Sequence, residues 1–332
     1  MPGFKVMTWN VENLFRPALG TDPAPYQDKL ALLSVVITGA NPDVVALQEI
    51  GGEEPVHDLQ EALAGLYPHR AVSNFPDGRG IRVAFISQLP LMNPQDLVDF
   101  PPGPALEIHG IDASGATSPI LRMGRGALHV RVTKGTWTID LITAHLKSKL
   151  LTFPRPWGSS FEPASEDERA QAAGIALMRR SAEAVTLRIR ANSLLVETSD
   201  RPMVVLGDFN DVPEAQTSLL LHGPAGSELG TGGFDRPDKG DDARLFNLAL
   251  LIPEERRFSR IHRGRRELLD QIFASEELFP RLGGGIRQTP TVDSLVDFRE
   301  NDALIASVTD NPTERVGEVA PDHAPVVAEF EL

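Results

Sequence analysis

Short apolar segments alternate along the chain with amphipathic stretches and polar loops. Apolar runs and alternating patterns predict β-strands at residues 4–11, 44–47, 83–87, 128–133, 137–146, 203–206, 268–274 and 326–330. Several of these runs are apolar at every position, which is typical of strands that are covered on both faces. Two neighbouring runs, 128–133 and 137–146, predict a hairpin that turns at Lys134 and Gly135. The pattern therefore predicts sheets that are buried between other layers.

Two stretches have the apolar spacing of amphipathic helices. The first covers residues 27–38 and ends before an Asn-Pro pair. The second begins near Ser165, where Ser165 and Glu168 fit a capping box, and continues through ERAQAAGIALMRRSAEAVTLRIR. The Pro- and Gly-rich residues 100–119 and the residues 232–242 predict surface loops. No internal repeat is visible, so we predict a single domain over residues 1–332.

Composition and charge narrow the classes of function. A hydrophobic content of 41% and a charged content of 23% are typical of a soluble globular protein. No apolar run approaches the roughly 18 residues of a membrane span, and the N-terminus has no signal-peptide pattern. We therefore expect a cytoplasmic protein without stable membrane association. The net charge of −14 gives no global attraction for polyanions, so nucleic-acid binding would be local and helped by a divalent cation.

Polar side chains end, or nearly end, several of the predicted strands. They are Asn10 in TWNVENLF, Glu49 in VVALQEI, His145 in LITAHLKSK, Asp208 and Asn210 in VVLGDFND, Asp270 in ELLDQIFAS, and Asp322 and His323 in APDHAPVVAEF. Each alone is more often a turn, cap or structural residue. If the strands lie side by side, however, their ends form one rim, and these distant residues meet in a single polar pocket.

These motifs, in this order, resemble the endonuclease/exonuclease/phosphatase superfamily with its deoxyribonuclease I-like fold. The matching segments are WNV, LQE, the histidine strand, GDFN, LDQI and DHAPV, and they span residues 9–326. The resemblance implies an α+β fold, a four-layer α/β/β/α sandwich of two packed mixed β-sheets with helices outside. It also implies a Mg²⁺-dependent phosphoesterase site at one sheet edge. HLKSKLLTFP and the helix after it look most like bacterial members described as nucleases.

The resemblance assigns metal binding first to Glu49, with Asn10 beside it and Asp322 as a further contributor. Mg²⁺ prefers oxygen ligands and keeps several waters, so one or two carboxylates suffice to hold it. Mn²⁺ and Ca²⁺ also accept oxygen ligands, and the sequence does not distinguish them from Mg²⁺.

The resemblance also assigns catalytic roles. Asp208 orients or deprotonates the attacking water, and the amide of Asn210 donates to a phosphate oxygen. His323 binds phosphate or transfers a proton, while Asp270 holds its ring in one tautomer. His145 is a candidate general acid or phosphate donor.

Three basic residues are candidate substrate contacts. Arg82 stands where related enzymes place a glutamate that orients the histidine corresponding to His145, and it contacts either a phosphate or a surface carboxylate. Arg263 belongs to the arginine-rich run 256–266, which is either a solvated hairpin or a phosphate contact. Lys147 follows His145 with strand alternation and is expected to point toward the same pocket.

The leading interpretation is a Mg²⁺-dependent phosphodiesterase, a nuclease acting on DNA. One alternative is a phospholipid or inositol-phosphate phosphoesterase with the same site, and another is a non-catalytic binding module. A lipid enzyme would need an exposed apolar hairpin, and base stacking would need aromatics among basic residues; neither is apparent in the sequence. A non-catalytic module would have lost some of Glu49, Asp208, Asn210, Asp322 and His323, yet all are present.

Overall fold

The computed structural model describes the chain with several short gaps. The residues outside the description are 1–2, 104–105, 198–201, 224–225, 230–242, 279–288, 301–302, 305–307, 312, 314 and 316–318. The predicted loop at 232–242 therefore lies outside the described residues.

One mixed sheet contains six strands in the order β17-β20-β1-β2-β4-β3. Their bounds are β1 (Gly3–Leu14), β2 (Val44–Ile50), β3 (His69–Val72), β4 (Arg82–Ser87), β17 (Thr291–Ser294) and β20 (Val326–Glu331). β1 and β2 are parallel, whereas the other neighbours pair antiparallel. The carboxyl ends of β1 and β2, which carry Asn10 and Glu49, therefore lie at the same edge.

The second mixed sheet has the order β13-β16-β12-β9-β8-β5. Its strands are β5 (Met92–Asp99), β8 (Arg122–Lys134), β9 (Trp137–His145), β12 (Met203–Asp208), β13 (Leu245–Asn247) and β16 (Asp270–Ser275). β9 and β12 are parallel, and the predicted hairpin of β8 and β9 is present. The predicted strands account for the centre of this sheet. The edge strand β13 comes shortly after residues that lie outside the description.

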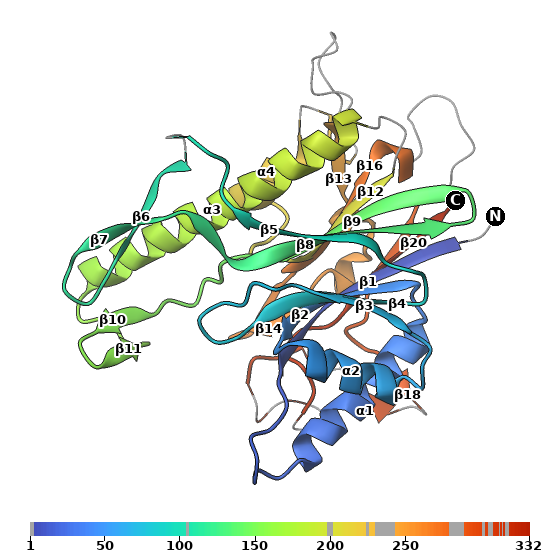
Figure 1. Cartoon of the computed structure of the whole chain (residues 1–332), viewed down its shortest axis with the longest axis horizontal. Coiled ribbons are helices and arrows are strands. Elements are labelled where there is room, and N and C mark those ends of the chain that lie inside the picture. Colours follow the sequence, from blue (N-terminus) through green and yellow to red (C-terminus); the bar gives the residue numbers. More distant parts are fainter. Residues whose placement is uncertain are drawn as a thin grey trace.

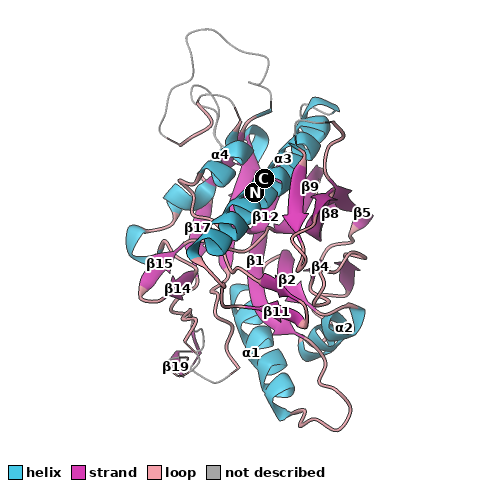
Figure 2. Cartoon of the chain, turned by 90° about the vertical axis from the view of Figure 1, so that its left-hand side faces the viewer, coloured by secondary structure: helices cyan, strands magenta, loops and turns pink. Residues whose placement is uncertain are grey.

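Helices cover the outer face of each sheet, and this produces four layers (Figure 2). α1 (Ala24–Ala40) and α2 (Glu53–Ala62) pack on the first sheet through a core that includes Trp9, Leu33 and Tyr67. α3 (Glu166–Glu197) and α4 (Gln216–His222) cover the second sheet. The central core between the sheets includes Phe4, Phe85, Leu206 and Phe330. The predicted α/β/β/α sandwich is confirmed.

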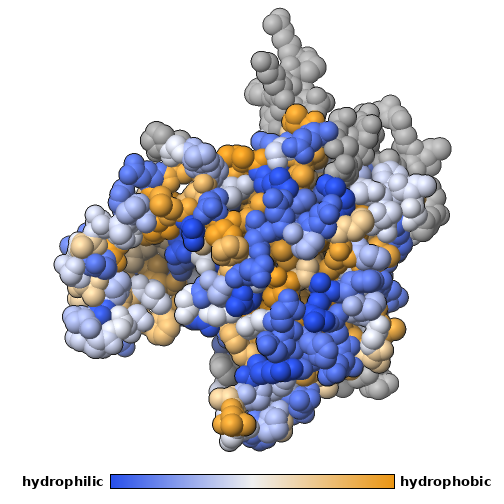
Figure 3. All heavy atoms as spheres, viewed as in Figure 1, coloured by the Kyte–Doolittle hydropathy of each residue, from blue (hydrophilic) through white to orange (hydrophobic). Residues whose placement is uncertain are grey.

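The first part of α3 projects beyond the sheets together with two hairpins, and we call this projection the arm (Figure 1). Its hairpins are β6 (Ile108–Ile111) with β7 (Thr117–Ile120), and β10 (Phe153–Arg155) with β11 (Gly158–Ser160). The surface of the arm mixes apolar and polar residues (Figure 3). The prediction of a plain loop at 100–119 is wrong, because β6 and β7 pair across a turn in which Asp112 accepts hydrogen bonds from its own loop.

The remaining elements are short. They are the hairpins β14 (Arg260–His262) with β15 (Arg265–Glu267) and β18 (Arg299–Glu300) with β19 (Ala303–Leu304), and the 3₁₀ helices η3 (Leu248–Leu251), η4 (Glu254–Arg256) and η5 (Glu276–Leu278). The predicted cap of α3 is present, because the Glu168 amide donates to Ser165 Oγ at 3.1 Å. Within the described part of the chain, no helix is both long and apolar enough to cross a membrane.

Candidate active site

Three residues of the second sheet lie side by side across adjacent strands. Asp208 ends β12 and pairs in register with His145 at the end of β9 and with Asp270 at the start of β16. All three are almost completely buried. Strand pairing therefore converts three motifs that are far apart in sequence into one row at the sheet edge.

The first sheet presents Asn10 and Glu49 at the facing edge. The regular pairing of β1 with β2 is interrupted after Asn10, and the pairing of β2 with β4 is interrupted between Gln48 and Ile50. These irregularities turn the chain at Glu49, whose φ is +65°. Positive φ is uncommon for residues other than glycine, and Asn210 shares it with a φ of +53°. Such backbone strain is often found at functional sites.

A hydrogen-bonded row crosses from one sheet to the other. Asn10 Nδ2 lies 3.0 Å from Asp208 Oδ2 and 3.5 Å from Glu49 Oε1. His145 Nε2 lies 3.3 Å from the same oxygen of Asp208. Burial, opposed chiefly by the positive charge of His323, raises the pKa of Asp208 to about 6. This carboxylate is therefore poised to accept a proton near neutral pH.

His323 and Asp270 form the second polar pair of the site. His323 Nδ1 lies 2.6 Å from Asp270 Oδ2, and Trp9 Nε1 donates to the His323 carbonyl at 2.8 Å. Burial disfavours the charged ring, but the carboxylates of Asp270 and Asp208 outweigh it and raise the pKa of His323 to about 10. The ring is thus held as an imidazolium, which presents its other N–H to the cleft.

These groups open into one cleft with a volume of about 700 Å³. Of the predicted site residues, the cleft is lined by Asn10, Glu49, His145, Asp208, Asn210, Arg263, Asp322 and His323. Asp270 lies behind His323. The geometric expectation that Glu49, Asp208 and His323 gather around one space is therefore confirmed.

Two predicted substrate contacts, Arg82 and Lys147, do not line this cleft. Arg82 donates to the Ser73 carbonyl at 3.2 Å and does not line the cleft. Lys147 points into a neighbouring cavity inside the arm. Asn210 lines the cleft, but its amide donates to the Leu146 carbonyl at 3.0 Å rather than pointing freely to the space.

The cleft also contains basic residues that the sequence reasoning missed. Arg79 and Arg125 line it, and Arg125 is held by a 3.0 Å hydrogen bond to Asp77. Glycines stand on either side of both Arg79 and Arg125, which was a weak signal. Arg260, from the arginine-rich run 256–266 that the sequence analysis singled out, also lines the cleft and pairs with Asp322 at 2.8 Å.

His145 lacks the carboxylate partner that the resemblance implies on its far side. Its Nδ1 is buried and has no hydrogen-bond partner within the described residues. Burial, followed by the positive charges of Arg125 and His323, places its pKa well below the usual value. The neutral ring lies with its Nε2 3.3 Å from Asp208 Oδ2. His145 is consequently a neutral polar group at neutral pH rather than a charged acid.

The donor set of the cleft fits a hard divalent cation. Glu49 is half-buried, and its Oε2 accepts the Asn13 amide at 3.1 Å; among the described residues, Oε1 then has only the long contact to Asn10. The carboxylates of Asp208 and Asp322 line the same cleft, where a divalent cation would neutralise negative charge. Oxygen groups without thiolates favour Mg²⁺ or a similar ion. Asp322 is committed to Arg260, so Glu49 is the ligand that is most available.

Comparisons with known proteins agree with this fold. The model of the "Endonuclease/Exonuclease/phosphatase family" matches residues 7–293. The fold is similar to human Nocturnin catalytic domain with bound sulfate (14% identity, TM-score 0.56, 99% of this chain and 94% of that chain). It is also similar to ANGEL2, a 2′,3′-cyclic phosphatase (14% identity, TM-score 0.57, 99% of this chain and 95% of that chain). A third similar structure is Caenorhabditis elegans TDP2 (13% identity, TM-score 0.51, 99% of this chain and 75% of that chain). No curated protein sequence matches the chain.

Proposed function

We propose that this chain, which belongs to the endonuclease/exonuclease/phosphatase family, is a Mg²⁺-dependent nuclease and that DNA is its substrate. The members of this family are metal-dependent phosphoric ester hydrolases. The observation that carries the proposal is the row from Glu49 through Asn10 to Asp208, beside the imidazolium of His323. Hydrolysis of a phosphodiester needs an activated water and positive charge at the phosphoryl oxygens, and this row supplies groups for both.

Each residue of the site has a separate role in the reaction. Asp208 accepts the proton of the attacking water, and Asn10 holds the Asp208 carboxylate in place through its amide. His323 places an imidazolium N–H against the phosphate, while Asp270 fixes its tautomer and therefore acts as a positioning residue. Glu49, with Asn10 and Asp322 nearby, would hold the cation, which supplies Lewis-acid stabilisation of the phosphoryl oxygens when bound.

The arginines of the cleft favour an anionic, extended substrate. Arg79 and Arg125 line one wall, and Arg263 lines another. In a chain with a net charge of −14, this local concentration of positive charge supports phosphate binding at the cleft itself. DNA remains our proposal over RNA because His145 and the other motifs resemble the deoxyribonuclease-like branch of the family.

A substrate panel tests this function. The purified protein is incubated with plasmid DNA, single-stranded DNA, RNA, bis-p-nitrophenyl phosphate, sphingomyelin and inositol phosphates, in Mg²⁺ or in EDTA. We expect cleavage of DNA in Mg²⁺ only, and none by Asp208→Asn. Turnover of sphingomyelin or inositol phosphate without nucleic-acid cleavage would support the phosphoesterase alternative, and no turnover of any substrate would support the binding module.

A further inference from the structure

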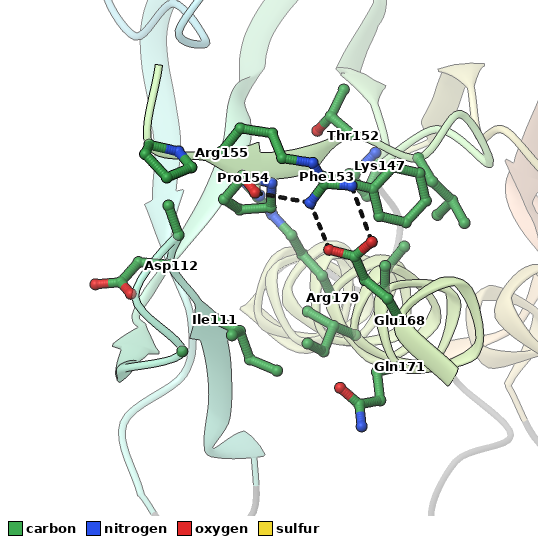
Figure 4. A pocket seen from close by; sticks show the side chains of 18 residues that line it. Ile111, Asp112, Lys147, Thr152, Phe153, Pro154, Arg155, Glu168, Gln171 and Arg179 are labelled. Carbon is green, nitrogen blue, oxygen red and sulfur yellow. Dashed lines mark hydrogen bonds and ion pairs between the residues drawn. The ribbon is translucent and has the colours of Figure 1, made fainter. Parts of the chain in front are cut away.

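A second cavity lies beside the cleft, inside the arm (Figure 4). This arm cavity has a volume of about 490 Å³ and is bordered by the β6–β7 hairpin, the β10–β11 hairpin and α3. Leu151 and Phe153 line both the arm cavity and the cleft. The two spaces are therefore neighbours, and a ligand longer than one phosphodiester can reach from one into the other.

Ion pairing within the arm neutralises two of the charged side chains that line its cavity. Arg155 forms a two-pronged ion pair with Glu168, at 2.5 and 2.9 Å, which fastens the β10–β11 hairpin to the first turn of α3 (Figure 4). The carboxylate of Asp112 accepts hydrogen bonds from Ser114 and Ala116 within its own turn. The Arg155–Glu168 pair therefore adds no net charge to the cavity, while Asp112 keeps its single negative charge.

Lys147 and Arg179 supply the positive charge that remains. Lys147 Nζ contacts the carbonyl oxygens of Ser148 and Leu150 at 3.0 Å, and within the described chain no carboxylate pairs with it. Within the described residues, Arg179 pairs with Glu183 at 3.5 Å, and that carboxylate also accepts the backbone amides of Gly124 and Lys147. In this part of the chain the Lys147 ammonium has no carboxylate partner and Arg179 has one that is already bonded, which is a suitable environment for an anion.

Two exposed aromatic side chains lie in or directly after the β10–β11 hairpin, which borders the arm cavity. Trp157, in the turn of β10–β11, is 82% exposed, and Phe161, just beyond β11, is 69% exposed and lines the cleft. Large exposed aromatic rings mark interaction sites. Aromatic rings beside cationic groups are typical of surfaces on which unpaired bases stack. The sequence shows no basic patch interleaved with aromatic residues, but the fold brings Lys147 and Arg179 to the cavity that the β10–β11 hairpin borders.

We propose that the arm cavity is a second phosphate-binding subsite for a single-stranded polynucleotide whose scissile diester lies in the cleft. Lys147 and Arg179 bind the flanking phosphate, and Trp157 and Phe161 stack on bases of the same strand. A single strand fits better than a duplex, because its bases are free to stack on protein rings. This inference rests on the proposed function and names the substrate form for the same site.

Kinetics with two lengths of substrate test the subsite. Cleavage of a 12-nucleotide DNA strand and of a dinucleotide is compared for the parent and for Arg179→Gln, Lys147→Gln and Trp157→Ala. We expect the ratio of kcat/KM for the long to the short substrate to fall about tenfold in each variant. The slope of log KM against log salt should decrease by about one for the charge variants and stay constant for Trp157→Ala.

A matched control removes one positive charge far from the site. Lys5 lies near the other end of β1 from Asn10 and pairs with Glu329, so Lys5→Gln should leave both the ratio and the salt slope unchanged. Trp157 is exposed, and its replacement should not affect folding, which thermal unfolding of each variant verifies.

The outcomes separate the two proposals. If the parent cleaves both substrates and the ratio stays within about twofold in Arg179→Gln and Trp157→Ala, the subsite is overturned while the proposed function stands. If the ratio is unchanged and Trp157→Ala abolishes cosedimentation with phosphatidylcholine vesicles, the hairpin contacts membranes and the subsite is again overturned. A parent that cleaves neither substrate contradicts the proposed function and the subsite together.

Discussion

The amide of Asn10 donates to the carboxylate of Asp208 across the interface of the two sheets, with 3.0 Å between Nδ2 and Oδ2. Asn10 belongs to β1 and Asp208 to β12, and they are separated by 198 positions in the sequence. The same amide faces Glu49 at 3.5 Å. One side chain therefore couples the carboxylate that would bind a cation to the carboxylate that would activate water.

Removal of the Glu49 carboxylate should abolish metal-dependent hydrolysis without loss of the fold. Glu49→Gln keeps the shape of the side chain but removes the charge that a divalent cation requires. We expect activity on bis-p-nitrophenyl phosphate in Mg²⁺ to fall by about 10³-fold or more, and Mg²⁺ binding by calorimetry to be lost. Glu331→Gln, at an exposed position of β20 opposite Gly3, is the control. Equal activity of Glu49→Gln and the parent would refute the assignment.

Replacement of the proton-transfer groups should affect turnover rather than binding. Asp208→Asn removes the proton acceptor, and His323→Ala removes the imidazolium that faces the phosphate. Each variant should lose about 10²–10⁴-fold in kcat, with a much smaller change in KM. Steady-state kinetics on the same diester measure both constants. A loss confined to KM would indicate a role in substrate binding.

Gly207 should be intolerant of any side chain. Its φ is +154°, and a Cβ atom there would overlap the carbonyl oxygen of Ala144 on the adjacent strand β9. We expect Gly207→Ala to lower the free energy of unfolding by about 3 kcal/mol or more, because backbone cannot yield as a side chain does. Gly135→Ala is the control, since Gly135 also has a positive φ of +60° but nothing within 4 Å.

Chemical denaturation of both glycine variants gives the comparison. Gly135→Ala should lower the free energy of unfolding by only about 1 kcal/mol, because alanine there is strained by the positive φ but overlaps no neighbouring atom. Similar losses in the two variants would show that the close approach of β12 to β9 is not the cause.

His222 should make the fold sensitive to acid. It is 8% exposed, neither ring nitrogen has a partner in the described part of the chain, and burial lowers its pKa below 6.5. Glu228 and Arg188 are the charged groups that act on it. The unfolded chain therefore binds more protons than the folded one, and stability is lost as the pH falls through 6.5 toward the folded pKa.

Substitution of His222 by phenylalanine tests this dependence. The edge-on contact with Phe273, now 5.4 Å between ring centroids, is retained in His222→Phe, while both unpaired nitrogens are removed. Between about pH 7.5 and about pH 5.5, the parent should lose about 1 kcal/mol more stability than the variant. Parallel losses in the two proteins would show that His222 does not contribute.

Much of the site could be predicted from strand ends in the sequence. Glu49, Asp208 and His323 each follow or precede a short apolar run, and strand patterns are local properties that one sequence records directly. Because the ends of neighbouring strands meet at one sheet edge, these residues could be placed in one pocket before the structure was known. Family resemblance supplied the arrangement of two packed sheets with helices outside, which local patterns do not contain.

The tertiary structure alone decided which other side chains share that pocket. Arg125 faces the cleft and Lys147 faces the arm cavity, although both belong to segments next to the same row of residues. Gln48, which sequence reasoning passed over, bridges the sheets through a 3.0 Å hydrogen bond to Thr143. Such choices depend on how surfaces from distant parts of the chain pack together. The sequence determines which side chains a strand carries, whereas tertiary packing determines which residues each of these side chains contacts.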